Sequence, residues 1–258
     1  MKPVFYHSDF FKYWNQIKEN SIDLILTDPP YGILTDIQKW DIIPPIKEME
    51  SIFNTILKPT GQVIIFSDLT FLIKLYSTFT HHFQFRFNLI WEKTGGMPIS
   101  EQRPIPNTEF ILVFRKKGIR EKDLCWNPYE MGEKGEPYIK RNYDKEIPIR
   151  KKRKQEYNTN KNGWRYPKTI IKAENKPNMN KSERTKHPTQ KPEILLRKLI
   201  RCFSNPEETI LDPFSGSGST LVSAFKENRY SLGFEIEKDY YTEAKQRINN
   251  ITSQEILL

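Results

Sequence analysis

Short apolar runs alternate with stretches of helical periodicity in this sequence, and this alternation constrains the fold more than any other feature. Residues 21–27 and 208–212 are too short for typical helices and run into an Asp-Pro step, so we expect buried strands. Residues 47–57 and 193–203 repeat apolar side chains at intervals of three and four, which predicts amphipathic helices. Strands that alternate with helices are typical of an α/β fold with a doubly wound, mainly parallel sheet.

The same criteria give further elements on either side of a central segment. Residues 59–61, with the sequence Pro-Thr-Gly, end the helix expected over 47–57. The remaining expected strands are 62–66, 85–91, 109–114 and 230–234, and the remaining expected helices are 69–79, 220–227 and 240–249.

The central segment, residues 118–185, breaks this pattern. It is rich in Lys, Arg, Asn, Pro and Tyr and poor in apolar periodicity, which predicts an insertion with exposed loops. Twelve Lys and Arg against three Asp and Glu lie between 140 and 172, a surplus equal to the net charge of +9 of the whole chain. Such a concentration of charge is typical of a nucleic-acid-binding surface. We expect 1–117 and 186–258 to form two halves of one core.

Several protein classes are excluded by the composition. No apolar run approaches the ~18 residues of a membrane span, and the N-terminus has no signal-peptide pattern, so we expect a cytoplasmic protein that makes no membrane contact. Cys125 and Cys202 lie far apart and belong to no metal-binding motif, which predicts two reduced thiols. The four histidines are scattered, so no metal site is expected.

A glycine-containing turn follows the strand expected over 208–212. Gly216 and Gly218 allow positive φ and let the backbone approach a ligand closely, and the next helix offers free N–H groups. Glu235 ends the following strand, where an acid holds ribose hydroxyls in nucleoside-binding α/β folds. The turn lacks the features of a triphosphate or dinucleotide loop, so it favours a cofactor with a ribose but no pyrophosphate. A plain βα turn is the alternative.

A second motif, Asp28-Pro29-Pro30-Tyr31, follows the strand expected over 21–27. The two prolines fix φ and remove two N–H groups, so they form a rigid corner with free carbonyl groups. The corner presents a carboxylate, a carbonyl and an aromatic ring, which suits an exocyclic base amine with two N–H donors and a flat ring. Residues 32–39 form either a loop over this site or an ordinary connection.

These two motifs, in this order, resemble those of the DNA amino-methyltransferases. The enzymes of this family use S-adenosylmethionine and have a Rossmann-like fold. Asp28-Pro29-Pro30-Tyr31 is similar to the catalytic D-P-P-Y motif, and residues 212–218 are similar to the D-P-F-x-G-x-G cofactor motif. The order is that of the permuted β group. Further similar segments are Ser8-Asp9-Phe10, TEFILVFRKK over 108–117, KHPTQKP over 186–192 and Gly233-Phe234-Glu235-Ile236.

The resemblance covers nearly the whole chain outside 118–185, and it implies roles for particular residues. The implied catalytic residues are Asp28, Pro29, Pro30 and Tyr31. The implied residues for S-adenosylmethionine are Asp9, Phe10, Asp28, His187, Thr189, Lys191, Asp212, Pro213, Phe214, Ser215, Gly216, Ser217, Gly218, Glu235 and Ile236. The family also implies a homodimer and a restriction–modification setting.

The insertion is the implied target-recognition region for double-stranded DNA. We expect its DNA contacts to include Arg150, Lys151, Lys152, Arg153, Lys154, Trp164 and Arg165. A solvated basic loop is the alternative for the run over 150–154, and Trp164 and Tyr166 either stack on bases or pack the insertion.

The implied reaction is methylation of N6 of adenine in a flipped base. Asp28 and a carbonyl of the proline corner would localise the lone pair of the amine. N4 of cytosine is the nearest alternative, with Asp at position 28 favouring adenine. Methylation of RNA or of protein glutamine is weighed lower, as is a non-catalytic nucleic-acid-binding module.

Overall fold

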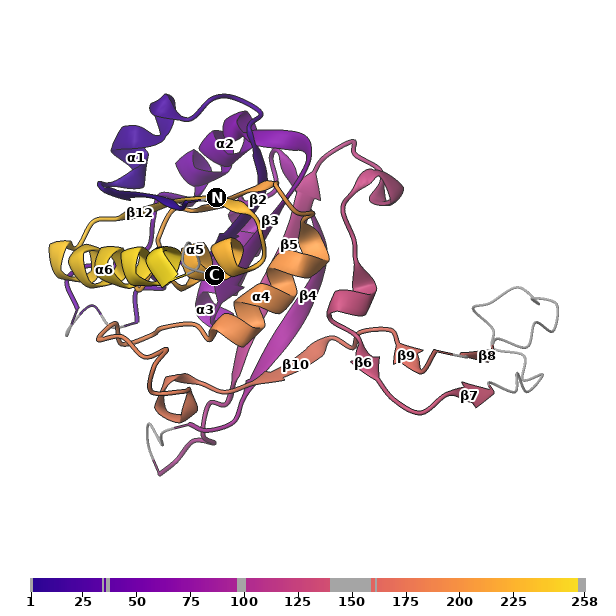
Figure 1. The fold of residues 1–258 in the computed structure, drawn as a ribbon. Helices are drawn as coiled ribbons and strands as arrows, with labels where there is room; N and C mark the ends of the chain where they lie inside the picture. Colours follow the sequence, from indigo (N-terminus) through magenta and orange to yellow (C-terminus); the bar gives the residue numbers. More distant parts are fainter. Residues whose placement is uncertain are drawn as a thin grey trace.

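The computed structural model describes residues 2–254 except 34, 36–37, 97–100, 140–158 and 161. Its main sheet has eight strands in the order β1-β12-β11-β2-β3-β5-β4-β10 (Figure 1). β5 runs antiparallel to β3 and β4, and every other neighbouring pair is parallel. The strands are β1 (Val4–His7), β2 (Ile22–Thr27), β3 (Leu57–Ser67), β4 (Phe83–Lys93), β5 (Thr108–Lys116), β10 (Ile170–Ala173), β11 (Thr209–Asp212) and β12 (Tyr230–Glu235).

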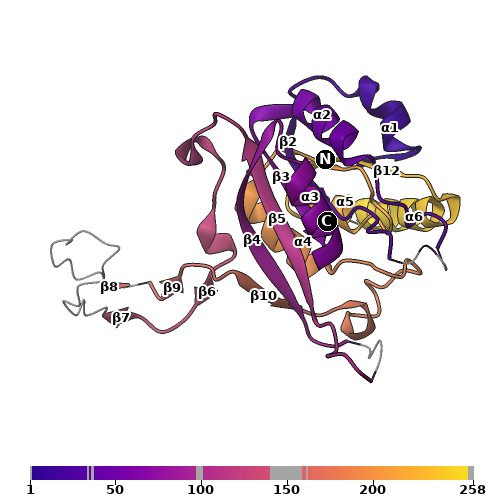
Figure 2. The ribbon, with the colours of Figure 1, turned by 180° about the vertical axis from the view of Figure 1, so that it is seen from behind.

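Helices cover both faces of this sheet, which confirms the expected doubly wound α/β fold. Alternate side chains of a strand point to opposite faces, and Leu24 packs with α4 whereas Ile25 packs with α2 and α3. Figure 1 shows α4 in front of the sheet, and the reverse view in Figure 2 shows α2 and α3 in front. The helices are α1 (Phe10–Tyr13), α2 (Ile46–Ile56), α3 (Leu69–Thr78), α4 (Glu193–Phe203), α5 (Ser219–Lys226) and α6 (Lys238–Gln254).

Each helix and strand expected from the sequence is present, with its ends shifted by a few residues. The segment 59–61 follows the end of α2 and lies within β3, where the pairing with β2 shifts register. Two strands of the main sheet were not expected, and both lie at its edges. β1 pairs with β12, and β10, which lies within the segment 118–185, pairs with β4.

The segment before β10 leaves the body of the protein as a narrow arm. It contains the paired strands β6 (Glu133–Lys134) and β9 (Trp164–Arg165), followed outward by β7 (Tyr138–Ile139) and β8 (Thr159–Asn160). Figures 1 and 2 both show this arm extending beyond the β10 side of the sheet. Short 3-10 turns join the arm to the body: η2 (Glu121–Asp123), η3 (Pro128–Glu130) and η4 (Lys176–Asn178), with a further turn, η1 (Trp14–Gln16), near the N-terminus.

Both cysteines are free thiols whose pKa values are raised by burial, Cys125 to about 11 and Cys202 to about 12. Among the residues that the structure describes, no His, Cys, Asp and Glu side chains gather in a group able to hold a metal ion. No helix in the described ranges combines the length and apolar character needed to cross a membrane.

Candidate active site

The carboxyl ends of the parallel strands meet at one edge of the sheet, above a cavity of about 850 Å³. In α/β sheets this edge is where ligands bind. The residues after β2, the end of β11 and the end of β12 all line the cavity. The first residues of β5 line it too, because this strand runs antiparallel to its neighbours and starts at this edge. Each predicted catalytic residue lines the cavity, and so does each predicted cofactor-binding residue except Gly218.

The turn between β11 and α5 is held by backbone hydrogen bonds, one to β12 and one within the turn. Ser215 N donates to Phe234 O at 2.8 Å, and Gly218 N donates to Ser215 O at 2.8 Å. Gly216 and Gly218 have φ of +48° and +70°, as the sequence predicted. A Cβ at Gly216 would lie 2.8 Å from His187 Nε2, so the turn and the His187 ring leave no space for a side chain.

Glu235 receives two backbone hydrogen bonds at the end of β12. Gly216 N donates to its Oε2 at 2.8 Å, and Glu237 N donates to its Oε1 at 2.7 Å. Burial raises the pKa of this carboxyl despite these bonds. The carboxylate is held rigidly at the cavity, where its remaining lone pairs can accept hydrogen bonds from ligand hydroxyls.

Asp212 supports the turn from within. Its Oδ1 accepts hydrogen bonds from Thr27 Oγ1 at 2.8 Å and from Phe214 N at 3.2 Å, and burial raises its pKa to about 6. It thereby ties β11 to β2. Asp9 has a similar supporting contact, since its Oδ1 accepts a hydrogen bond from Phe11 N at 3.0 Å and caps α1.

The remaining predicted cofactor residues surround the same end of the cavity. Phe10 is buried, and its ring packs edge-on against Phe234 at 5.5 Å between centroids. Ile236 is 56% exposed, and Thr189 is exposed too. Phe10 and Ile236 add apolar surface to the lining of the cavity.

His187 lies between two aromatic rings that the sequence did not assign to the site. Its ring centroid is 5.6 Å from that of Trp40 and 4.5 Å from that of Tyr240. Burial lowers its pKa to about 3, with Lys191 and Lys176 adding to the effect, so the ring is neutral at physiological pH. His187 Nδ1 is buried and has no hydrogen-bond partner among the described residues. This nitrogen is therefore available for a hydrogen bond with a ligand.

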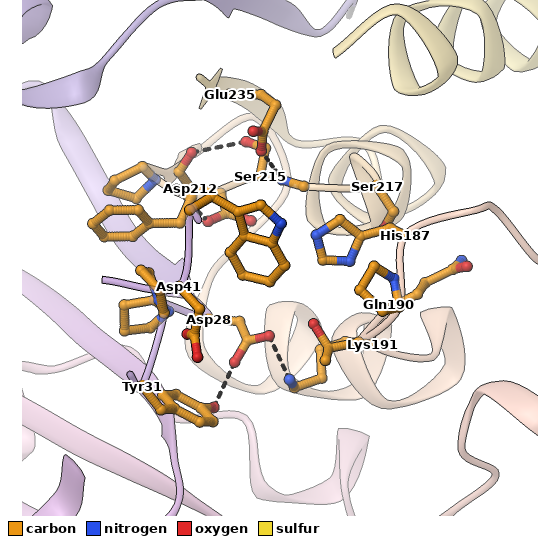
Figure 3. Close-up of a pocket in the computed structure, with 18 of the residues that line it drawn as sticks. Asp28, Tyr31, Asp41, His187, Gln190, Lys191, Asp212, Ser215, Ser217 and Glu235 are labelled. Carbon is orange, nitrogen blue, oxygen red and sulfur yellow. Dashed lines mark hydrogen bonds and ion pairs between the residues drawn. The ribbon is translucent and has the colours of Figure 1, made fainter. Parts of the chain in front are cut away.

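Asp28 lies at the other end of the cavity, with each carboxylate oxygen bound by a different side chain. Tyr31 Oη donates to Asp28 Oδ1 at 2.5 Å, and Lys191 Nζ donates to Oδ2. Figure 3 shows Asp28 between Tyr31 and Lys191, with Glu235 and Ser215 across the pocket. The Tyr31 ring stacks on Phe71 at 5.5 Å between centroids. A predicted cofactor residue, Lys191, thus contacts the predicted catalytic acid.

Glu109 completes this cluster, and sequence reasoning did not assign it a role. Its Oε1 accepts a hydrogen bond from Tyr31 Oη at 3.0 Å and lies 2.9 Å from Lys191 Nζ, and its Oε2 lies 2.9 Å from Lys93 Nζ. The available signal was an acid beside the first residue of an otherwise apolar strand. Because β5 is antiparallel, its N-terminal end lies at the edge where the parallel strands end.

The pKa values in this cluster follow from burial and mutual charge. Burial raises the pKa of Asp28, and the nearby Glu109 carboxylate adds to this, whereas Lys191 opposes it. Burial by itself would raise the pKa of Glu109, but the ammonium groups of Lys191 and Lys93 outweigh it, so the pKa of Glu109 is lowered. Burial and both carboxylates raise the pKa of Tyr31 well above its usual value, so its hydroxyl remains a donor.

The predicted DNA contacts are only partly described. Residues 150–154 lie outside the described residues. Trp164 is 39% exposed on β9, and Tyr129 lies near it with a centroid distance of 6.4 Å, while Tyr166 is 64% exposed. Trp164 and Arg165 do not line the cavity.

Comparison with known proteins gives consistent matches along the chain. The model of the N6_N4_Mtase family, described as DNA methylase, matches residues 22–246. The chain is 29% identical to the Type II methyltransferase M2.DpnII of Streptococcus pneumoniae, covering 96% of this chain and 90% of the relative. It is 28% identical to the Type II methyltransferase M2.LlaDCHI of Lactococcus lactis subsp. cremoris, covering 95% and 89%. Among solved structures, the complex of M1.HpyAVI with SAM matches at a TM-score of 0.64 with 26% identity, covering 95% of this chain and 98% of that one.

Proposed function

Since the chain belongs to the N6_N4_Mtase family of DNA methylases, we propose that it methylates N6 of adenine in duplex DNA with S-adenosylmethionine as the methyl donor. One observation carries this proposal. A single cavity holds a proline-lined carboxylate, Asp28, at one end and a backbone-anchored carboxylate, Glu235, at the other. The first suits a base amine and the second suits the hydroxyls of a ribose.

The residues at the Glu235 end fit S-adenosylmethionine. The absence of a side chain at Gly216 keeps the turn open beside His187, and the buried His187 Nδ1 has no partner in the described residues. The turn carries no Lys or Arg suited to a pyrophosphate. Glu235 would hold the ribose, and Phe10 and Ile236 would contact the adenine ring. The SAM complex of M1.HpyAVI supports the same cofactor.

The chemistry at the other end is assigned to Asp28 and the proline corner. S-adenosylmethionine supplies an electrophilic methyl group when bound. A conjugated amine is a weak nucleophile, and hydrogen bonds from its two N–H groups to Asp28 and to a carbonyl of Pro29 or Pro30 localise its lone pair. A carboxylate has about four lone-pair sites, so Asp28 can accept the amine while it keeps its bonds to Tyr31 and Lys191.

The charge of Asp28 also complements the positive charge that develops on the amine nitrogen. Because a base inside a duplex cannot reach a buried carboxylate, the target must be flipped out, at a cost of a few kcal/mol. We propose Tyr31 as the ring that contacts the flipped base. It already lies in the cavity, stacked on Phe71.

The family includes N4-cytosine enzymes as well as N6-adenine enzymes, and the amine of cytosine offers similar geometry to Asp28. An acid at this position supports adenine, and N4 of cytosine is the second candidate. The projecting arm, with the basic run over 150–154 in the sequence, is proposed to bind the DNA backbone. The Type II methyltransferases among the relatives support a restriction–modification setting.

The test is methylation of DNA from a methylation-free host. Purified protein is incubated with this DNA and labelled S-adenosylmethionine, and the modified nucleoside is identified by mass spectrometry. N6-methyladenine is the expected product. N4-methylcytosine would replace the proposed substrate with the second candidate, and no labelled nucleoside from protein that binds the cofactor would overturn DNA methylation.

A further inference from the structure

Four side chains form a closed ring of interactions at the catalytic end of the cavity. Tyr31 and Lys191 each contact both Asp28 and Glu109, so the two carboxylates are bridged twice. The Lys191 and Glu109 side chains are only 8% and 9% exposed, whereas Asp28 is 21% exposed at the cavity. Both carboxylates line the cavity, but Asp28 is the more exposed of the two.

Lys191 presents an electrostatic difficulty for the proposed reaction. Its ammonium group contacts the carboxylate that must accept the target amine, and the amine gains positive charge as it is methylated. A buried cation paired with Asp28 alone would cancel the negative charge that stabilises this change. It would also repel the forming cation, and such repulsion is strong where water is excluded.

Glu109 removes this difficulty by supplying a second negative charge to the same ammonium group. Asp28, Glu109 and Lys191 together carry one net negative charge, and the exposed part of that charge is on Asp28. Lys93 contacts Glu109 Oε2, the oxygen that does not contact Lys191, and its side chain is 24% exposed, against 8% for Lys191. Lys191 is thus shared between two acids.

We propose that Glu109 is a positioning residue that binds Lys191 and thereby keeps the charge of Asp28 available to the target amine. This role rests on the proposed function. Lys191 in turn holds the two carboxylates together, which would otherwise repel each other within the buried ring. Tyr31 Oη lies between the two carboxylates, within hydrogen-bond distance of both, and can donate its single proton to one or the other.

The proposal predicts an unusual pattern in a double-mutant cycle. In Glu109→Gln, Lys191 pairs with Asp28 alone, so we expect kcat to fall about ten-fold or more while KM for DNA and cofactor changes about three-fold or less. Lys191→Met in the Glu109→Gln background removes the unbalanced cation, so the double variant should be faster than Glu109→Gln. A merely structural role predicts that the second substitution makes the enzyme slower or leaves it unchanged.

The pH profile of kcat provides a second readout. Besides the four members of the ring, the titratable groups that face it are Lys93, Asp212 from β11 and His187, whose pKa Lys191 lowers. Removing Glu109 leaves Lys191 to lower the pKa of Asp28, so the acid limb should move to lower pH in Glu109→Gln. It should move to higher pH in Lys191→Met. The control is Glu92→Gln on the neighbouring strand β4, which removes a partly exposed acid paired with Lys172 and should leave kcat and its pH profile unchanged.

Unfolding in urea tests the charge coupling without any methylation. Lys191→Met leaves Asp28 and Glu109 facing each other, so it should lower the free energy of unfolding more at pH 8 than at pH 6. Adding Glu109→Gln should reduce that pH dependence to the part that burial of Asp28 alone produces. Additive effects on unfolding, or a double variant no faster than Glu109→Gln, would overturn the role of Glu109 even if the wild type methylates DNA. Coupling in the unfolding cycle with no methylation by the wild type would instead overturn the proposed function.

Discussion

Gly216 N donates a hydrogen bond of 2.8 Å to Glu235 Oε2, so the turn after β11 and the end of β12 are fixed to each other. This bond sets the distance between the backbone of the turn and the proposed ribose-binding carboxylate. The same glycine lies against His187, so the three residues form one rigid wall of the cavity.

Gly216→Ala should therefore reduce cofactor affinity. The new Cβ would meet the His187 ring at 2.8 Å on a backbone with φ of +48°, so either the turn or the ring must move. We expect the Kd for S-adenosylmethionine, measured by calorimetry, to rise about ten-fold or more, since backbone strain of this kind costs about 1–3 kcal/mol.

Gly118→Ala is the matched control for this substitution. Gly118 also has a positive φ, +80°, but an added Cβ meets nothing within 4 Å. It should lower the free energy of unfolding by about 1–2 kcal/mol and leave cofactor affinity unchanged. Equal cofactor affinity in both variants would contradict the proposed wall.

Asp28→Asn should abolish most of the activity while preserving cofactor binding. The amide cannot supply the negative charge that complements the methylated amine, so kcat should fall about 100- to 1000-fold, the scale of removing one preorganised electrostatic partner. The Kd for the cofactor should change by less than about three-fold, because its proposed ribose and adenine contacts lie at the other end of the cavity. Single-turnover rates and calorimetry measure the two quantities. A variant with wild-type kcat would remove Asp28 from the mechanism.

Asp212→Asn should change the pH dependence of stability. Burial raises the pKa of Asp212 to about 6, from about 3.9 in an unfolded chain. The folded protein therefore binds a proton more tightly, and its free energy of unfolding falls as pH rises from about 4 to 6. The loss of stability caused by ionising buried Asp212 is fully present above pH 6 and amounts to at most about 3 kcal/mol.

The asparagine variant lacks this cost, so relative to the wild type it should be more stable at pH 8 than at pH 4.5. Urea unfolding at the two pH values measures the difference. The same change in stability at both pH values would show that ionisation of Asp212 does not contribute.

Trp164→Ala should weaken DNA binding without affecting the cofactor. The ring is exposed on the arm and away from the cavity, and stacking on a base is worth about 1–3 kcal/mol. We expect the Kd for duplex DNA, measured by fluorescence anisotropy, to rise at least about five-fold. Tyr230→Ala, an exposed aromatic at the start of β12, is the control and should bind DNA as the wild type does. Equal affinities would assign Trp164 to packing against Tyr129.

β2 could be predicted from the sequence because it is a short apolar run that is buried on both faces. α4 could be predicted because it buries one face and repeats apolar residues at intervals of three and four, and the Asp-Pro steps mark where β2 and β11 end. β1 and β10 were missed because each is a four-residue edge strand in which only one or two side chains are buried. Such short strands give no periodic signal above the background of a loop.

The residues of the site that belong to recognisable sequence motifs could be predicted, and those outside the motifs could not. Asp28 and Glu235 follow strands directly, so their placement at one edge of the sheet follows from parallel topology. Glu109 could not be placed in this way, because the direction of β5 is not encoded in its own residues. Its contact with Lys191 joins positions that lie far apart in the sequence, and only the folded sheet reveals it.

The strand order has a consequence for biosynthesis. β2 pairs along one edge with β3, which follows it closely in the sequence, and along its other edge with β11. The side chains of Thr27 and Asp212, which link β2 to β11, are 185 residues apart in the sequence. While the chain is being made, β2 therefore exposes an unpaired edge and an apolar face until β11 has left the ribosome. Exposed strand edges of this kind invite pairing with other chains. The catalytic corner and the adjacent Thr27 therefore acquire their contacts with Lys191 and Asp212 only after those residues have been synthesised.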